Sequence, residues 1–445
     1  MRAVDVGANY GIYTAAMARS VAPGGRVWSF EPTPSATDLL HRTIALNGFD
    51  HVELSSAAVS DHDGTVEFAI GCDSELNKIA RVGTSAGETL RIPAVSLNQI
   101  SSTQDWGGID FIKIDVEEHE PQVIAGGAGF FSQHSPLVML EVLSDGRFET
   151  RALDQLKEMN YELFRLIPGL NVLAPVDLRE LDSFHLNMFA CKRPRAKKLA
   201  AEDCLSPIDT AASSKPDSNA WGSFLESARY ASEFARHWPE KAGFFSATGT
   251  RIYYDGLASF AQSRDAKRSA SQRLAWLRRA FERVRRAIEQ HNTLPRTISC
   301  ARLAWELGLR EAATRCLWQA ANRIREGATS AQREPFLAPS LRYEALAVDA
   351  APQDWLECSV LEQLEKARAF SSLYGGAQTR SVLEPILGRP FRSPESERRR
   401  QLLRMRTGTQ SKPEAHPLLC LASEENLNPA YWCPAETDRT SPSSA

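Results

Sequence analysis

The 445-residue sequence predicts an α/β domain with a doubly wound, mainly parallel sheet over residues 1–192, followed by an all-helical domain. Three observations lead to this prediction. Apolar, strand-like runs alternate with amphipathic runs as far as Lys192, and a glycine-rich turn follows the first of them. Strand signals nearly vanish in the second half of the chain.

The first predicted strand ends in the turn "VDVGANYGIYT", residues 4–14. Its apolar run breaks at Gly7 and resumes with helical spacing after Gly11, which predicts strand, loop and helix. Such a turn can hold a pyrophosphate at a helix N-terminus, or let the backbone approach a nucleoside cofactor. Asp5 favours the second, because a carboxylate repels pyrophosphate and attracts the sulfonium of S-adenosylmethionine. Any tight strand-to-helix turn would give the same pattern.

The second predicted strand, "RVWSFEP" (26–32), carries Glu31 near its end, about twenty residues after the glycines. A carboxylate at this place can accept hydrogen bonds from both hydroxyls of a ribose, in NAD and S-adenosylmethionine alike. The alternative is a solvated acid at the start of the next helix. That helix is predicted over 35–48, with Ser35 as its cap and Gly48 at its end.

Three further strands are predicted at 51–59, 109–116 and 135–142. The last two are nearly continuous in apolar character, as is typical of strands covered by helices on both faces. Ligands of open α/β sheets bind beyond the carboxyl ends of the strands. We expect four carboxylates to crowd this edge: Asp5, Glu31, Asp115 and Glu141. Their mutual repulsion would have to be offset by a cation or a hydrogen-bonding substrate.

His119 lies in the segment "IKIDVEEHE" (112–120), just after a predicted strand. Histidine is the side chain best suited to take a proton at neutral pH, which makes His119 a candidate catalytic base. The alternative is that His119 and Glu120 form the polar first turn of a helix, where the dipole favours Glu. The carboxylates nearby could hold a divalent cation, but no dedicated ligand cluster stands out, so no metal is predicted.

Taken together, these stretches resemble the FkbM family of S-adenosylmethionine-dependent methyltransferases, over roughly residues 1–192. The resemblance implies a class I methyltransferase (Rossmann-like) fold, with a mainly parallel seven-stranded sheet and one reversed strand. It also implies O-methylation of hydroxyls, often on sugars, polysaccharides or complex natural products. The matching segments are "VDVGANYGIYT", "FEPTP", "LNGF", "AAVSDHDGTVEF", "VSLNQI", "IDFIKIDVEEHEPQVIAGG" and "LVMLEV".

The resemblance also assigns residues to the cofactor, S-adenosylmethionine. Glu31 would hold the ribose, and Asp61, after the third strand, would lie near the adenine. For methyl transfer, the enzyme must align the acceptor oxygen with the methyl carbon and remove the hydroxyl proton. We expect His119 to take that proton, with Asp115 as second choice or as the group that orients the acceptor. Four residues would shape the methionine end of the site: Asp5, Gly7, Asn9 and Gly11.

Two departures from the family pattern keep other functions open. Glu118 stands where the family usually has Gly, and a positive φ there would cost about 1 kcal/mol. The family also usually has sequence before the first strand, and here there is almost none. A decayed methyltransferase that acts as an interaction protein through its helical domain is therefore one alternative. A nicotinamide-dependent dehydrogenase is disfavoured, because the turn lacks Gly-x-Gly-x-x-Gly and carries Asp5.

The second half of the chain begins with residues 193–220, a polar segment rich in Ser, Ala and Pro that predicts a linker. A helical accessory domain is expected over 221–435 and a disordered tail over 436–445. Residues 272–290 place apolar side chains on one helical face, and their arginines could bind an anionic partner, such as an acidic glycan or a nucleotide-sugar lipid carrier, or simply be solvated. The helical domain as a whole could have a protein or glycan partner. Residues 299–324 resemble one tetratricopeptide-like helical pair.

Composition restricts the remaining partners. The formal net charge is −3, which gives no electrostatic reason to expect nucleic acid or an anionic membrane as a partner. Eight cysteines without CxxC pairs suggest reduced thiols in a cytoplasmic protein. No apolar run is long enough to span a bilayer, and no secretory signal is visible. The expected partner is a hydroxyl-bearing acceptor, with carbohydrate as the favoured class.

Overall fold

The structure is a computed structural model in which the chain divides into two compact units. One comprises Met1–Ala212, Asp265–Ala275 and Glu306–Leu309, and the other comprises the rest. The structure describes residues 1–21, 23–69, 78–79, 89–104, 106–144, 147–148, 150–176, 181, 184–207, 216–217, 220–238, 250–327, 334–348, 351–369, 381–386, 388–396, 399–400 and 404.

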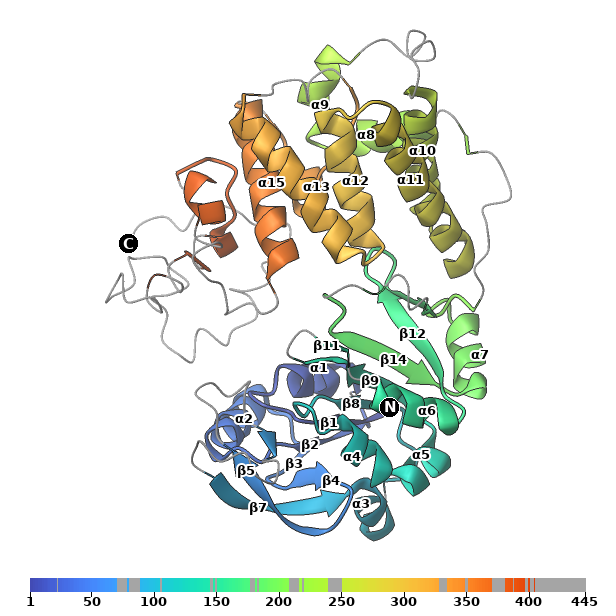
Figure 1. Ribbon diagram of the computed structural model, residues 1–445, viewed down its shortest axis with the longest axis vertical. Coiled ribbons are helices and arrows are strands. Elements are labelled where there is room, and N and C mark those ends of the chain that lie inside the picture. Colours follow the sequence, from blue (N-terminus) through green and yellow to red (C-terminus); the bar gives the residue numbers. More distant parts are fainter. Residues whose placement is uncertain are drawn as a thin grey trace. The chain divides into compact units, whose positions relative to one another are not determined.

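The N-terminal unit is built on an eight-stranded sheet (Figure 1). From one edge to the other, its strands are β13 (Val172–Pro175), β12 (Glu162–Ile167), β14 (Asn187–Cys191), β9 (Leu137–Glu141), β8 (Phe111–Ile114), β1 (Arg2–Val6), β2 (Arg26–Phe30) and β3 (Val52–Ser55). The strands from β9 to β3 are parallel, and β14 runs antiparallel to both of its neighbours. The predicted doubly wound sheet with a reversed strand is confirmed. The eighth strand is β13, which adds an antiparallel hairpin to β12.

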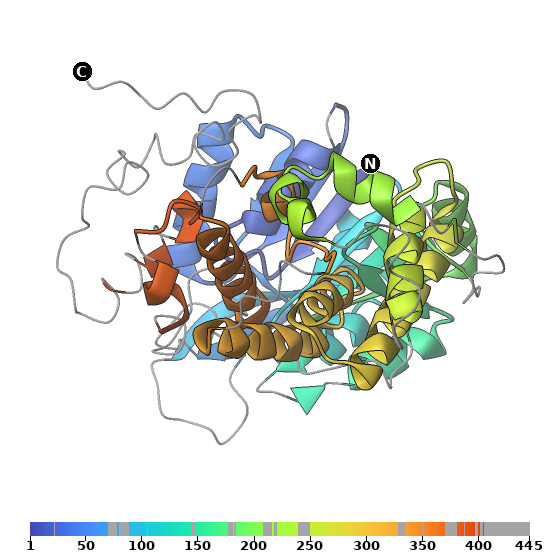
Figure 2. The same ribbon diagram turned by 90° about the horizontal axis from the view of Figure 1, so that it is seen from above.

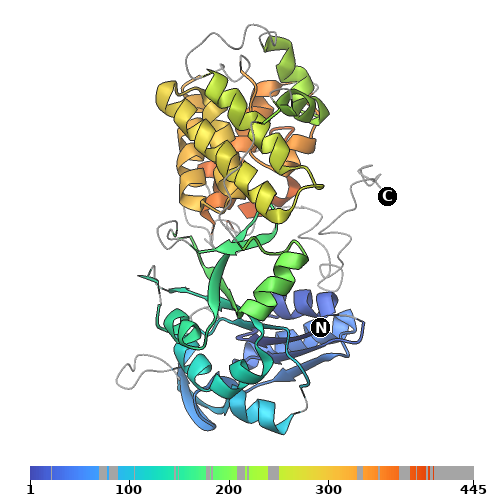
Figure 3. The same ribbon diagram turned by 90° about the vertical axis from the view of Figure 1, so that its right-hand side faces the viewer.

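Helices cover both faces of this sheet, as its apolar strands require. Alternate residues of β1 and β2 face opposite sides: Ala3 and Val27 pack towards α1, whereas Val4 and Trp28 belong to the larger core on the other face. Figure 3 shows α1 and α2 on one side of the strands and α4 to α6 on the other. These helices are α1 (Ile12–Val21), α2 (Pro34–Asn47), α3 (Leu97–Thr103), α4 (Glu120–Ala125), α5 (Ala128–His134) and α6 (Arg151–Glu158).

A second, smaller sheet corrects one strand prediction. The run 51–59 is two strands rather than one, because β3 pairs with β2 whereas β4 pairs with β7. The chain leaves the main sheet after Ser55, and the buried Ala58 pairs with Ala94. The small sheet has the order β4 (Ala58–Ser60), β7 (Thr89–Ser96), β5 (Gly64–Ala69) and β6 (Lys78–Ile79). A two-stranded pair, β10 (Leu143–Ser144) and β11 (Arg147–Phe148), follows β9.

The ends of α2 show one confirmed and one wrong prediction. The helix ends at Gly48, whose φ of 62° provides the left-handed cap that glycine favours. It begins at Pro34, with Thr33 as N-cap and no side-chain capping bond, so Ser35 is not the cap. Proline suits the first helical position because its fixed φ is already helical and its missing N–H has no intrahelical partner there.

The segment expected to be a linker, 193–220, begins with a helix. Its first part forms α7 (Arg193–Ala201), which exposes Arg193, Lys197 and Lys198 and buries Ala196. Ala196 and the following Leu205 pack with three residues of the sheet: Phe164, Leu173 and Cys191. Residues 208–215 lie outside the described part of the chain.

The described elements from residue 220 onward are helices (Figures 1 and 2). The predicted helical pair is present as α12 and α13, joined through Gly308, which has a φ of 75°. None of the described helices is both long and apolar enough to cross a lipid bilayer. The expected tail, 436–445, lies outside the described residues. The elements are α8 (Ala220–Ser227), α9 (Ala231–Phe234), η3 (Ala235–His237), α10 (Thr250–Ser263), α11 (Ala270–Gln290), α12 (Leu294–Glu306), α13 (Arg310–Arg325), α14 (Leu341–Ala345), α15 (Pro352–Arg368) and η6 (Glu384–Ile386).

Candidate active site

The structure places four acidic residues at the carboxyl edge of the main sheet. They lie in the last two positions of four neighbouring parallel strands, β2, β1, β8 and β9, or directly follow them, so all four residues lie at one edge of the sheet. These residues are Glu31, Asp5, Asp115 and Glu141.

The turn after β1 requires glycine at two positions. Gly7 has a φ of 80°, and a Cβ there would lie 1.8 Å from the carbonyl oxygen of Asp115. Gly11 has a φ of 86°, and its Cβ would lie 2.2 Å from Cδ1 of Leu40 on α2. The N–H groups of Gly7 and Ala8 both donate to the carbonyl of Phe30. The bare backbone of this turn therefore allows β1 to contact the ends of β8 and β2 closely.

Asp5 is fully buried, and its carboxylate faces α1 rather than solvent. Its Oδ2 accepts a hydrogen bond of 2.6 Å from Thr14 Oγ1, and its Oδ1 lies 3.9 Å from Nζ of Lys113. Burial raises the pKa of Asp5, and Lys113 and Thr14 oppose that shift. Because the side chain is inaccessible, Asp5 positions the turn and Lys113 and cannot itself contact a ligand in this conformation.

Lys113 is a buried cation that sequence reasoning missed. Its ammonium lies 2.8 Å from Oδ2 of Asp115 and 4.6 Å from the ring centroid of Tyr13. Burial lowers the pKa of Lys113, but the carboxylates of Asp115 and Asp5 together raise it above its usual value. The available signal was a lysine inside the apolar strand "FIKI", two residues before Asp115 and thus on the same face.

Tyr13 extends from the first turn of α1 towards the same charges and remains 40% exposed. Burial raises the pKa of its phenol, which stays protonated at neutral pH. With Tyr10 and Ile12 it forms a partly exposed apolar group at the start of α1. An aromatic face is therefore available beside the acidic edge.

Glu31 is held by two backbone N–H groups. Its Oε2 accepts from Asn9 at 2.7 Å and its Oε1 from Thr33 at 2.8 Å. A carboxylate has further lone pairs, so both oxygens retain acceptor capacity. Asn9 has a left-handed φ of 48°, and its buried Oδ1 has no hydrogen-bond partner within the described residues. The turn thus presents an unsatisfied acceptor next to an ordered carboxylate.

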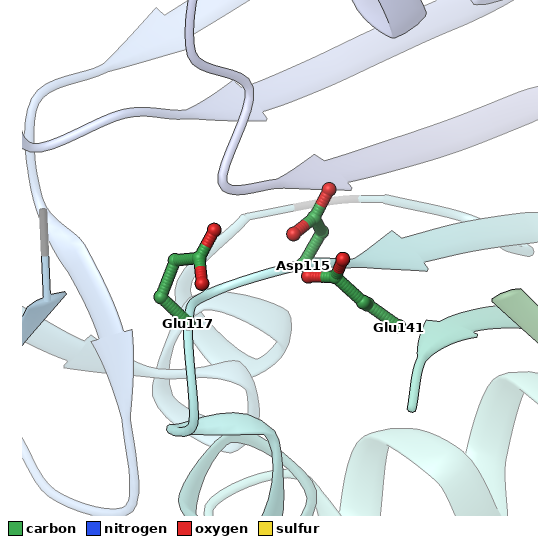
Figure 4. Close-up of side chains that lie close together, drawn as sticks. All are labelled: Asp115, Glu117 and Glu141. Atoms are coloured by element: carbon green, nitrogen blue, oxygen red, sulfur yellow. The ribbon is translucent and has the colours of Figure 1, made fainter. Parts of the chain in front are cut away.

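Asp115, Glu117 and Glu141 lie close together (Figure 4), with one oxygen of each within 4.8 Å of the others. Glu141 donates a hydrogen bond to Asp115, so the pair holds a proton on Glu141. Burial and the charge of Asp115 raise the pKa of Glu141 to about 10, while Lys113 keeps Asp115 ionised despite its burial. The three oxygens are of the type that hard divalent cations bind. Sequence reasoning had not included Glu117 in this group.

The contacts of His119 involve other residues than the carboxylate group of Asp115, Glu117 and Glu141. It precedes α4, and its Nε2 is 2.9 Å from Oγ of Ser60 at the end of β4. Ser60 Oγ donates to Asp61 at 3.1 Å, and His62 Nδ1 lies 2.6 Å from the same Asp61 oxygen. Burial lowers the pKa of His119, so its imidazole is neutral at pH 7. Two predicted site residues, His119 and Asp61, are thereby brought into one polar cluster.

The mainly parallel sheet and the glycine turn after β1 define this unit as a Rossmann-like α/β domain. Residues 5–163 match the model of the Methyltransferase FkbM domain. No functionally curated protein matches the sequence.

Solved structures of methyltransferases are similar to part of the chain. A methyltransferase FkbM from Methylobacillus flagellatus KT has 17% sequence identity and a TM-score of 0.29, and the match covers 42% of this chain and 43% of that one. A SAM-dependent O-methyltransferase from Thermotoga maritima has 16% identity and a TM-score of 0.25, and the match covers 43% and 58% of the two chains. The chain therefore spans less than two thirds of the length of either relative.

Proposed function

We propose that the N-terminal domain transfers the methyl group of S-adenosylmethionine to a hydroxyl oxygen. The observation that carries the proposal is the acidic edge beside the glycine turn. Glu31, Asp115 and Glu117 supply carboxylates there, and Lys113 has its charge taken up by Asp5 and Asp115. A pyrophosphate would find no unpaired cation in Lys113, whereas a sulfonium is attracted by the acidic groups.

The turn suits the cofactor. Glu31 is ordered by two N–H groups and keeps lone pairs for a ribose diol, and Asn9 Oδ1 offers an unpartnered acceptor. Gly7 and Gly11 shape the turn, and Asp61, which follows β4, is assigned to the adenine end of the cofactor. When bound, S-adenosylmethionine supplies an electrophilic methyl group on a sulfonium that is already a good leaving group.

In this proposal His119 acts as the general base and Asp115 orients the acceptor. His119 is neutral at pH 7, so its imidazole can accept the hydroxyl proton, and Asp61 stabilises the imidazolium. Asp115 is ionised and fixed by Lys113 and Glu141, so it orients the acceptor by accepting a hydrogen bond from its hydroxyl. A low pKa makes Asp115 a weak base, which is why His119 remains the first choice.

The acceptor is proposed to be a carbohydrate or a similarly polyhydroxylated natural product. An acidic edge repels anionic acceptors and offers several carboxylates to neutral hydroxyls. Tyr10 and Tyr13 add partly exposed aromatic rings next to that edge, and such rings can pack on the apolar face of a sugar.

Binding and transfer assays test the proposal in two stages. Calorimetric titration should show binding of S-adenosylmethionine and none of NADH; preferential NADH binding would overturn the proposal in favour of a dehydrogenase. Radiolabelled methyl transfer to glycan, lipid and small-molecule fractions of a lysate should then identify the acceptor class. Label confined to fractions without hydroxyl groups would contradict O-methylation.

Variants separate the two candidate catalytic residues. His119→Gln should lower kcat by at least about 100-fold and remove the acidic limb of the pH profile, with cofactor affinity unchanged. Asp115→Asn should mainly raise the KM for the acceptor. The reverse pattern would make Asp115 the base.

A decayed domain is the second candidate, and the left-handed Glu118 favours it. Its φ is 72° at a position where the family usually has glycine. Full binding of S-adenosylmethionine without transfer to any fraction would support this reading.

A further inference from the structure

Two cysteine thiols of the helical unit are hydrogen-bonded to each other. Cys300 belongs to α12 and Cys316 to α13, and the Cys300 thiol donates to the sulfur of Cys316. The hairpin register explains the pairing. Cys300 lies six residues before the end of α12 at Glu306, and Cys316 lies six residues after the start of α13 at Arg310. With a turn this short the helices are antiparallel neighbours, so both positions are level with each other.

The two thiols differ in access and charge. Cys300 is buried, with 4% of its surface exposed, whereas Cys316 is partly exposed. The hydrogen bond from Cys300, supported by Arg315, lowers the pKa of Cys316 despite its burial, and the same bond raises the pKa of Cys300. Because Cys316 is the more accessible of the two thiols, it is the attacking group, and the buried Cys300 is the resolving group.

We propose that Cys300 and Cys316 form a reversible disulfide between α12 and α13 by exchange with a low-molecular-weight disulfide such as oxidised glutathione. The Cys316 thiolate attacks one sulfur of that disulfide, which forms a mixed disulfide and releases one glutathione thiolate. Cys300 then loses its proton and attacks the Cys316 sulfur, which releases the second glutathione. The protein gives up two electrons and two protons, and two glutathione thiols carry them away.

The other free cysteines of the described chain provide internal controls. Cys204 is exposed, and its thiol donates to the carbonyl of Glu202, so it should take up glutathione without forming a protein disulfide. Cys191 and Cys358 are buried, and burial raises their pKa values to about 11 and about 12. Both should stay reduced in the folded protein.

Mass spectrometry of the full-length protein tests the proposal. The reduced protein is incubated under native conditions with oxidised glutathione, alkylated and digested with trypsin, which separates the cysteines into the peptides 297–302 and 316–323. We expect these peptides to be joined by a disulfide that dithiothreitol reverses, with Cys204 carrying glutathione. Cys300→Ser should leave a glutathione adduct on Cys316, and Cys316→Ser should leave Cys300 unmodified.

Three results would overturn the proposal. One is glutathione on both Cys300 and Cys316 without a joined peptide. Another is a joined peptide that forms only after unfolding in urea. The third is cross-linking of Cys316 to Cys204 as often as to Cys300. The main measurement is made on the wild-type protein, so the test remains valid even if a variant fails to fold. Its result does not depend on the methyltransferase proposal.

Discussion

Lys113 has two buried or partly buried carboxylates as partners and no access to bulk water. Lys113→Met would leave Asp5 and Asp115 without their cation, which should lower the free energy of unfolding by about 3 kcal/mol. The matched control is Lys157→Met, because Lys157 pairs with Asp154 at 2.9 Å but both side chains are about half exposed. Exposed pairs contribute less than about 1 kcal/mol. Calorimetric melting of both variants checks the difference.

The contribution of Lys113 to the free energy of unfolding should change with pH in a direction that its pKa shift determines. The folded-state pKa of Lys113 is raised, so its contribution is fully present below the unfolded pKa of about 10.4 and disappears only as pH rises through the folded pKa. The difference in melting temperature between wild type and Lys113→Met should therefore be the same at about pH 7 and about pH 9. A difference that vanishes by about pH 9 would contradict the assignment.

Substitutions of Glu118 test whether its left-handed backbone conformation is strained. Its φ of 72° costs an L-residue about 1 kcal/mol more than glycine, so Glu118→Gly should stabilise the domain by about that amount and raise its melting temperature by about 3 °C. Glu118→Ala removes the carboxylate but keeps the Cβ and is the control. Equal stabilisation by both substitutions would attribute the effect to charge and not to backbone conformation.

Some site residues were accessible from sequence and others were not. Asp5, Glu31, Asp115 and Glu141 followed from strand ends alone, because parallel strands align their carboxyl ends. The burial of Asp5 and its contact with Lys113 depend on the β1–β8 register, which pairs these two residues directly. His119 follows β8 in sequence, but its contact with Ser60 arises from β4 of the second sheet, whereas the sequence predicts β3 and β4 as one strand.

At the scale of elements, the close approach of the β1 turn to β8 is the feature on which the site depends. Gly7→Ala would place a Cβ 1.8 Å from a backbone oxygen and should displace the turn, with loss of cofactor binding by at least about tenfold. Gly24→Ala is the control: its φ is 79°, almost the same, but nothing lies within 4 Å of its Cβ. Titration calorimetry on both variants separates steric contact from the cost of positive φ. Equal losses of affinity would refute the steric argument.

The elements that sequence failed to predict have weak local signals. The α7 helix is polar and basic, and only Ala196, Leu199 and Ala200 form its apolar side, so its helical character depends on packing against β12 and β14. The break between β3 and β4 lies within residues 54–59, all apolar or small, and pairing with different partners creates it. In contrast, α2, α11 and the α12–α13 pair have long amphipathic patterns or a glycine stop, and these were predicted within a few residues.

At the scale of the whole molecule, the chain consists of two compact units of different architecture. The glycine turn, Glu31 and the carboxylate group all belong to the α/β unit, whereas the dithiol of Cys300 and Cys316 belongs to the helical one. Each unit has its own buried core, so we expect two unfolding transitions and not one cooperative event. The effect of a ligand on each unit can therefore be measured separately.

Cofactor binding should act on one unit only. At a concentration of about 100 times Kd, a ligand that binds only the folded state stabilises it by about 2.7 kcal/mol, so S-adenosylmethionine should raise one of the two melting transitions by several degrees. Hydrogen exchange should slow in the turn at residues 5–14, around Glu31 and in residues 115–120, and remain unchanged in α13 and α15. NADH at the same concentration is the control and should protect none of these segments. Protection of α13 or α15 without protection of residues 5–14 would refute a cofactor site at the carboxyl edge of the sheet.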